Sequence, residues 1–246
     1  DGTRVQRKTG GYPVDGNDGT TAYEGSGSSF IDTDLDADTA YYYRAWSQAE
    51  SGGQWSDGYA EDFAATDGVL PVVDTEPATD VTSAGATLHG TIVDDRGSAC
   101  QYRFVYGVVS GPPYDFATSW AGSLISDDPF QATVDSLSPG TEYYYRAEAR
   151  NDSGDASGPE LSFIILPDAP SELSATPTGE DAITLSWTPG AGSTETVLVR
   201  KTGDYPTGPT DGEEIYRDSG TLYADTGLLP GVTYYYGAWG YHADSD

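Results

Sequence analysis

Short stretches of alternating apolar and polar residues recur along the chain, and turns rich in Gly, Pro, Asn and Asp separate them. An alternation with a period of two places successive side chains on opposite faces of a β-strand. In the middle of the chain it predicts strands over Ala86–Val93, Gln101–Tyr106, Phe130–Val134, Tyr143–Arg150 and Leu161–Leu166. Helical periodicity is nearly absent, so the pattern indicates an all-β protein.

The same alternation continues toward the end of the chain. There it predicts strands over Glu172–Ala175, Ile183–Trp187, Thr196–Lys201, Glu214–Arg217, Leu222–Ala224 and Thr233–Trp239. Two Pro-bearing stretches, 66–71 and 166–170, read as short linkers between the groups of strands.

An internal repeat organises these strands. Arg7-Lys8-Thr9-Gly10 recurs 193 residues later as Arg200-Lys201-Thr202-Gly203, and Tyr41-Tyr42-Tyr43 recurs at the same spacing as Tyr234-Tyr235-Tyr236. A third copy of the tyrosine run, Tyr143-Tyr144-Tyr145, lies between them. A register kept without a net gap over some fifty residues indicates one duplicated structural unit.

The repeats predict three domains with boundaries at 1–68, 69–166 and 167–246. The first lacks counterparts of the first two strands of the last, and the last ends before any counterpart of the strand at 59–65. Two readings stay open for these incomplete end units. The chain is a window of a longer tandem array, or neighbouring copies complete its ends by strand addition.

The motifs around the tyrosine runs resemble the fibronectin type III family, and the resemblance covers nearly the whole chain. Leu-x-Pro-Gly-x-x-Tyr before an alternating strand, as at 137–143 and 228–234, is similar to the corner between that family's fifth and sixth strands. The resemblance implies tandem immunoglobulin-like antiparallel β-sandwiches, and it points to repeats of large secreted or surface-attached prokaryotic proteins. Because this fold serves many tasks, the resemblance says little about function.

The resemblance also implies roles for individual residues. The hydroxyls of Tyr41, Tyr143 and Tyr234 are expected to bond to upstream backbone as tyrosine corners, although Ala37-Asp38 replaces Pro-Gly before Tyr41. Trp187 is expected in the core on the second strand. The middle unit has His89-Gly90 there, so its core must be filled differently.

Alternation places a row of aromatic residues on the face opposite the corner tyrosines. This candidate contact face comprises Tyr42, Trp46, Tyr144, Tyr235, Trp239 and Tyr241. Outward aromatic rows often mark contact surfaces. Three readings stay open: Arg44 and Arg146 cover the rings locally, the rings pack against another domain or chain, or they stack on glycans.

The excess of acidic residues limits the classes of partner that this protein can bind. Forty acidic residues against eleven basic ones give a formal net charge of −29, which disfavours nucleic acid and anionic membranes. No apolar run approaches a membrane span, and the single Cys excludes an intrachain disulfide. A high density of surface carboxylate groups is typical of a protein that stays soluble in strong salt, as in a saline habitat. An ordinary calcium-tolerant surface protein is the alternative.

No catalytic pattern is found, and we predict no enzyme and no cofactor. Asp32, Asp34 and Asp36 share one face if extended, so calcium is considered there, but they do not match a calcium-loop motif. The predicted function is a segment of an extracellular tandem-repeat structural protein that forms a surface stalk or filament through self-association. The alternative is an adhesin or glycan-binding spacer of a larger secreted enzyme.

Overall fold

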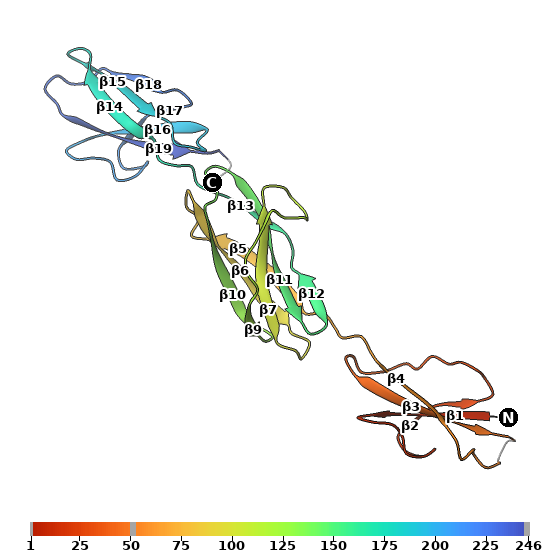
Figure 1. Ribbon diagram of the computed structural model, residues 1–246. Helices are drawn as coiled ribbons and strands as arrows, with labels where there is room; N and C mark the ends of the chain where they lie inside the picture. The colour runs from red at the N-terminus through yellow and green to blue at the C-terminus, as the bar shows by residue number, and fades with distance from the viewer. Residues whose placement is uncertain (1, 50–52, 244–246) are drawn as a thin grey trace. The chain divides into compact units, whose positions relative to one another are not determined.

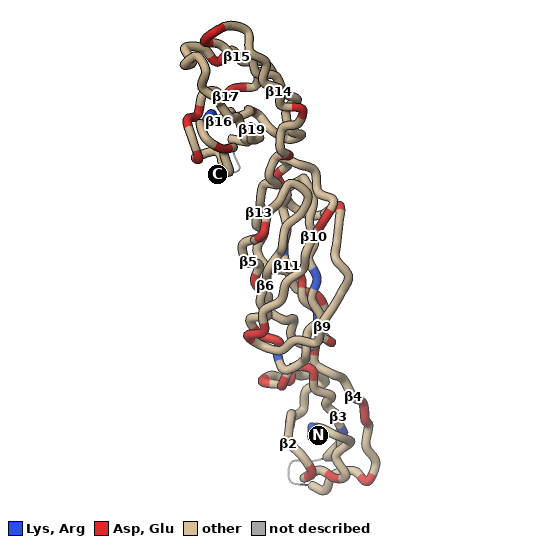
Figure 2. The backbone as a smooth tube through the Cα atoms, turned by 90° about the vertical axis from the view of Figure 1, so that its left-hand side faces the viewer, with Lys and Arg blue, Asp and Glu red and all other residues tan. Residues whose placement is uncertain are grey.

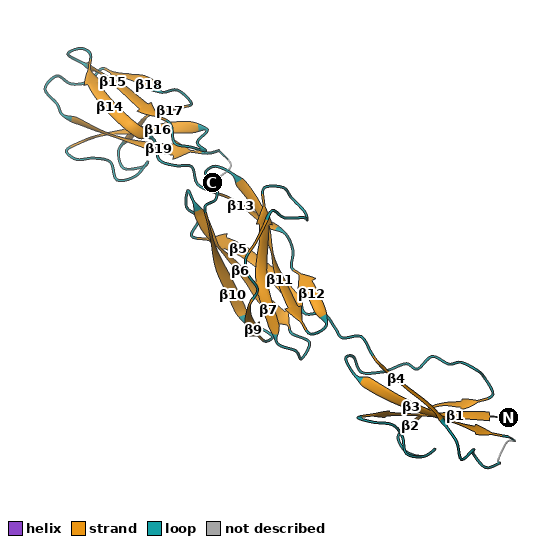
Figure 3. Ribbon diagram, viewed as in Figure 1, coloured by secondary structure: helices purple, strands orange, loops and turns teal. Residues whose placement is uncertain are grey.

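The structure is a computed structural model that describes residues 2–49 and 53–243. All of its regular elements are β-strands, arranged in antiparallel sheets (Figure 3). The predicted fold class, tandem antiparallel β-sandwiches, is confirmed. The chain divides into two compact units, one that holds the residues up to Pro71 together with Arg150–Asp155 and one that holds the rest. First, middle and third domain denote the three predicted segments 1–68, 69–166 and 167–246.

The described part of the first domain contains one sheet (Figure 1). Its strands are β1 (Gly2–Thr9), β2 (Thr20–Gly25), β3 (Ala40–Gln48) and β4 (Ala60–Ala65), in the order β2-β1-β3-β4. A loop lies against the inner face of this sheet, and Phe30 from that loop stacks on Tyr23 with ring centroids 5.1 Å apart.

The inner face of this sheet keeps a hollow. A space of about 330 Å³ borders Val5, Tyr43 and Ala64. Leu198, the repeat counterpart of Val5, is fully buried in the third domain beneath a second sheet. In the described part of the first domain no strand takes the place of that second sheet.

The middle domain has two sheets. One has the order β10-β6-β5. The other has the order β12-β11-β7-β8, with β13 on β11 and β9 on β7. The strands are β5 (Val72–Thr79), β6 (Gly85–Asp94), β7 (Cys100–Gly107), β8 (Phe116–Ala117), β9 (Ala121–Leu124), β10 (Pro129–Asp135), β11 (Glu142–Asn151), β12 (Gly154–Ser157) and β13 (Leu161–Ile164).

In the middle domain Gly90 stands where the third domain has the core residue Trp187, and the ring of Phe130 fills the space that this Trp would take. A Cβ on Gly90 would lie 2.7 Å from Cζ of Phe130, so the ring lies directly on this glycine. The ring also stacks on Tyr102, with centroids 4.3 Å apart. A Gly in one strand and a Phe in the next therefore occupy the space that one large residue takes elsewhere.

The third domain also has two sheets, in the orders β14-β15-β18 and β17-β16-β19. Its strands are β14 (Ser171–Pro177), β15 (Ala182–Thr188), β16 (Glu195–Thr202), β17 (Glu213–Asp218), β18 (Leu222–Thr226) and β19 (Tyr234–Tyr241). Trp187 lies in the core with Leu185, Leu198 and Tyr236. Its indole N–H donates to Oγ1 of Thr196 at 3.0 Å, so the buried polar atom is satisfied.

In the middle and third domains, sequence alternation located the long strands to within two residues at their ends, but it missed four strands. β8, β9 and β12 have two to four residues each, too few for a periodic signal. β5 contains Asp74, Glu76 and Pro77, which disfavour a strand by composition, but pairing with β6 forms it.

The first domain also differs from expectation in its number of strands. The loop at 29–33 is the counterpart of β18, yet it forms no strand. β18 pairs only with β15, and the described part of the first domain has no counterpart of β15. Strand formation at this position therefore depends on its neighbour more than on local sequence.

Replacing Gly90 by Ala should destabilise the middle domain. The new methyl group would meet the Phe130 ring at 2.7 Å and the Asp74 carbonyl oxygen at 2.8 Å. Overpacking of this kind costs about 1–3 kcal/mol. Backbone amide hydrogen exchange of peptides from β6 and β10 should become faster by the factor that corresponds to this loss in the free energy of unfolding. Gly208→Ala, where a Cβ meets nothing within 4 Å, is the matched control, and equal exchange in both variants would contradict the prediction.

Candidate functional site

Each tyrosine run begins with a ring whose hydroxyl accepts a hydrogen bond from backbone five residues upstream. The donors are the N–H groups of Asp36, Ser138 and Leu229, at 2.9, 3.1 and 3.0 Å from the hydroxyls of Tyr41, Tyr143 and Tyr234. The turn before Tyr41 lacks Pro-Gly, but Asp38 takes the positive φ of 50° that Gly140 and Gly231 supply elsewhere. Each bond thus ties the turn before the strand to the strand itself.

A buried network accompanies this bond in the first and third domains. In the third, Asp225 accepts from the Arg200 guanidinium at 2.7 Å and from the Tyr236 hydroxyl at 2.8 Å. In the first, Asp32 accepts from Arg7 and Tyr43 at 2.7 and 2.9 Å. All three members recur at the 193-residue spacing.

The network raises the pKa of its tyrosines. Burial is the largest cause at Tyr43, followed by the hydrogen bond to Asp32 and by its negative charge, and the pKa rises to about 12. The same causes, with Asp225 in place of Asp32, raise the pKa of Tyr236. In the middle domain the Tyr145 hydroxyl donates instead to the carbonyl of Glu76 at 2.6 Å.

The contact face expected in the first domain is occupied by an arginine. The Arg44 guanidinium lies 4.1 Å from the ring centroid of Tyr59 and 5.3 Å from that of Tyr12. It also donates to Glu61 at 2.7 Å. Tyr42 contacts Tyr12 edge-on on one side and stacks on Phe63 on the other, with centroids 5.1 and 5.5 Å away.

The prediction that Trp46 is an outward contact residue is wrong. Only 7% of Trp46 is exposed. Arg4 on β1 pairs opposite it, and Tyr59 lies 6.1 Å away between centroids, so both neighbouring segments cover the indole. Alternation correctly gives the face of the strand, but it does not show what lies on that face.

In the middle domain, arginine and glutamate side chains lie on the face that corresponds to the candidate contact face. Arg103 and Arg146 both bond to the largely buried Glu148, at 2.7 and 2.9 Å. The Tyr144 hydroxyl donates to Glu142 on its own strand at 2.8 Å. Ion pairs lie on this face, the Arg146 guanidinium lies 5.5 Å from the Tyr114 ring centroid, and Tyr144 itself is half-buried.

In the third domain Tyr235, Trp239 and Tyr241 of the aromatic row are half-buried. Tyr235 contacts Tyr205 edge-on at 5.0 Å between centroids, and Tyr205 is 69% exposed. Trp239 leans over Gly237, the counterpart of Arg44. The Arg217 guanidinium lies 4.6 Å from the Tyr241 ring centroid. Without an arginine at position 237, this face lacks the ion pair that closes its counterpart.

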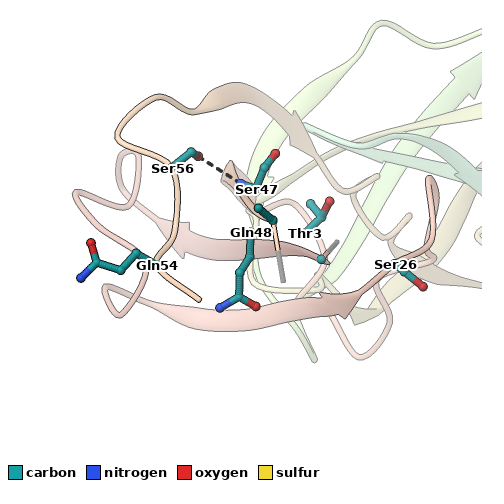
Figure 4. Close-up of a pocket in the computed structure, with 8 residues that line it drawn as sticks. Thr3, Ser26, Ser47, Gln48, Gln54 and Ser56 are labelled. Atoms are coloured by element: carbon teal, nitrogen blue, oxygen red, sulfur yellow. Dashed lines mark hydrogen bonds between the residues drawn. The ribbon is translucent and has the colours of Figure 1, made fainter. Parts of the chain in front are cut away.

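A hollow of about 520 Å³ lies at one end of the first domain (Figure 4). Its lining is neutral and polar, with Thr3, Ser26, Ser47, Gln48, Gln54 and Ser56 contributing hydroxyl and amide groups. The Ser47 N–H donates to Oγ of Ser56 at 3.1 Å and fixes the loop after β3. The lining residues that the structure describes offer both hydrogen-bond donors and acceptors.

The three aspartates considered for calcium, Asp32, Asp34 and Asp36, do not form a common site. Asp32 is engaged by Arg7 and Tyr43, and the Asp36 carboxylate lies 3.4 Å from the Tyr41 hydroxyl. Asp34 has a positive φ of 58°, which breaks the extended geometry that the shared face required. Within residues 2–49 and 53–243, no three His, Cys, Asp or Glu residues gather as a metal site would need.

Acidic residues are spread over the loops and strand ends of every domain (Figure 2). Lys and Arg are few, and most of those described pair with a carboxylate. The described residues contain no helix long and apolar enough to cross a membrane. The surface that remains is strongly negative.

Comparison with known proteins gives one curated relative and several solved structures. No family model matches the chain. It is 29% identical over 170 residues to protein sidekick-1 of Gallus gallus, a match that covers 65% of the chain and 8% of that protein. The chain therefore spans about a twelfth of the relative it matches.

Two solved structures contain fibronectin-type segments. A segment of two fibronectin type III domains from chicken tenascin is 19% identical, covering 72% of this chain and 93% of that one, with a TM-score of 0.43. The FN1–FN3 domains of chicken CNTN1 are 14% identical, covering 98% and 83%, with a TM-score of 0.32. The fold assignment rests on the strand pairing described above.

The Tyr43 hydroxyl should titrate with a midpoint near pH 12. Because its folded-state pKa lies above the ordinary value near 10, its contribution to stability is complete below about pH 10 and is lost as the pH rises through 12. The difference in phenolate absorbance between the wild type and Tyr43→Phe, followed as the pH rises, measures the titration midpoint of the Tyr43 hydroxyl. Asp32→Asn should lower the midpoint, and a wild-type midpoint near 10 would contradict both the burial of the Tyr43 hydroxyl and its hydrogen bond to Asp32.

Proposed function

We propose that this chain is a segment of an extracellular tandem-repeat structural protein that forms a surface stalk or filament. The observation that carries the proposal is a repeated set of contacts that hold the fold together. Lys8 pairs with Asp18 at 3.0 Å and Lys201 with Asp211 at 2.9 Å, again 193 residues apart. Such duplication serves a protein that repeats one stable unit along its length.

The arrangement of the aromatic residues supports a structural role. In the first and middle domains the residues of the expected contact face are bound by arginines and glutamates of the same domain. Side chains used in this way stabilise a sheet and leave no row of free rings for a ligand. The proposal includes no catalysis.

The acidic surface supports an extracellular location of high ionic strength. A net charge of −29 on 246 residues produces strong self-repulsion in dilute salt. At 1 M salt the Debye length is about 3 Å, so neighbouring units can approach. We extend this proposal to a prokaryotic, surface-attached protein from a saline habitat.

Immunogold electron microscopy of source cells tests the proposal directly. Antibodies against the full chain should label structures that project from the cell surface. Label confined to the cell interior would reject the proposal.

The alternative is a glycan-binding spacer, and the neutral hollow beside β3 favours it more than the aromatic row does. Gln48 and Gln54 carry amides that can bond to sugar hydroxyls, and the lining residues that the structure describes carry no charge. In this version the hollow replaces Trp46, which is buried. A glycan array with the wild type and Gln48→Ala distinguishes the two functions, because a glycan-binding spacer gives a signal that Gln48→Ala weakens, whereas a purely structural stalk or filament gives no signal with either protein.

Replacing Arg44 by Ala should destabilise the first domain without changing any glycan signal. The change removes the bond to Glu61, a bond to the Pro13 carbonyl at 2.8 Å and two ring contacts. We expect a loss of about 1–2 kcal/mol. Faster hydrogen exchange in β3 and β4 measures it, with Arg96→Ala as the control for an exposed arginine. An Arg44→Ala variant of unchanged stability would contradict the structural role of this face.

A further inference from the structure

The turn between β11 and β12 carries the tripeptide Asn151-Asp152-Ser153. Asn-x-Ser, with any residue except proline in the middle, is the acceptor pattern for N-linked glycosylation in surface segments of exported proteins. The pattern also arises by chance, so the placement of this asparagine in the fold decides what it can do. Asn17, the other asparagine of this sequence, is followed by Asp18-Gly19 and lacks the pattern, and it therefore serves as the matched comparison.

Asn151 lies at the tip of a tight hairpin. β11 ends at Asn151 and its neighbour β12 begins at Gly154, which leaves Asp152 and Ser153 as the two turn residues. The side-chain carbonyl oxygen of Asn151 accepts a hydrogen bond from the Ser153 N–H at 2.9 Å, which closes an Asx turn. Asp152 is exposed and its two neighbours are half-buried, so the whole tripeptide lies at the surface of the middle domain.

The amide nitrogen of Asn151 already has a partner, and that contact is compatible with modification. Nδ2 donates to the carbonyl oxygen of Val69 at 3.0 Å. An amide nitrogen carries two hydrogens, so a sugar that replaces one of them leaves the other to serve the Val69 carbonyl. The modified side chain therefore keeps the number of hydrogens that its contact with the linker requires.

Two exposed apolar side chains lie beside this turn. Val69 and Leu70 are 44% and 46% exposed. Val69 is joined to Asn151 by its carbonyl, and Leu70 lies against the turn, because a Cβ on Gly154 would meet Cδ2 of Leu70 at 2.9 Å. An N-linked sugar is bulky and hydrophilic, so on Asn151 it shields apolar side chains that otherwise face water. The acceptor pattern therefore stands where such a group stabilises the surface.

We propose that Asn151 carries an N-linked glycan. The donor is a sugar joined through phosphate to a membrane lipid, and a transferase that acts on exported chains delivers it. A bond forms between Nδ2 of Asn151 and the anomeric carbon of the sugar. The bond between that carbon and the phosphate oxygen breaks, and its electron pair leaves with the phosphate. One Nδ2 proton goes to a base of the transferase, and nothing is oxidised or reduced.

The glycan rests on one part of the proposed function, the export of the chain. Peptide mass spectrometry of the full chain recovered from the surface of source cells tests it. The peptide that contains Asn151 should carry added mass that is lost in steps of single sugar residues. Asn151→Gln and Ser153→Ala should each lose this mass completely. Ser153→Thr keeps the hydroxyl of the acceptor pattern, and Asn17→Gln changes the other asparagine, so both should retain it.

Ser153→Ala separates the sugar from the structural role of Asn151. The backbone N–H of residue 153 still donates to the Asn151 carbonyl oxygen, and the Asn151 amide still reaches Val69, because neither bond uses the serine hydroxyl. The substitution removes only the hydroxyl that the acceptor pattern requires. Loss of the added mass in this variant therefore follows from the missing hydroxyl and not from a misfolded turn.

Three outcomes would overturn the glycan, and they differ in what they say of the proposed function. Unmodified Asn151 on chains recovered from the cell surface rejects the glycan and leaves the stalk or filament intact. An added mass that survives Asn151→Gln and disappears in Ser153→Ala identifies a sugar on the Ser153 hydroxyl instead. A chain that is unmodified and confined to the cell interior rejects both proposals.

Discussion

A buried aspartate that accepts from both an arginine and a tyrosine is the interaction on which the end domains depend. Asp225 is almost fully buried, and its charge is tolerable only because Arg200 and Tyr236 both bond to it. Removing one partner of such a pair leaves a buried charge uncompensated, which is strongly destabilising. The network joins β16, β18 and β19, and therefore joins the two sheets. The tyrosine corner at Tyr234 fixes the turn that leads into the last of them.

The first domain shows what this network can hold by itself. Asp32 lies in a loop there and not in a strand, yet it makes the same two bonds as Asp225. The loop is positioned by these side-chain bonds, and Phe30 and Asp32 of the loop border the hollow beside Val5 in the described part of the chain. Polar contacts thus determine where the segment lies, and a neighbouring strand determines whether it becomes part of a sheet.

Arginine has a second role on the opposite face. Arg44 lies against Tyr12 and Tyr59 and pairs with Glu61, so one side chain joins the loop, the central strand and the edge strand. Where Gly237 replaces it, Trp239 leans into the space and the face stays apolar. A single Arg-to-Gly difference between the two copies therefore separates a closed face from an open one.

The sequence by itself determined the all-β class, the long strands and the repeat, because alternation and identical spacing are local or linear signals. It also identified the tyrosines whose hydroxyls bond to the turns. It could not assign Asp32, which looked like one of three calcium ligands, because its partners Arg7 and Tyr43 are brought to it by strand pairing. The recurrence of all three residues at the same spacing was the signal available. Only the tertiary structure decided that Trp46 is covered and that Phe130 fills the space above Gly90, since each depends on which segment lies next to another across the sheet or the core.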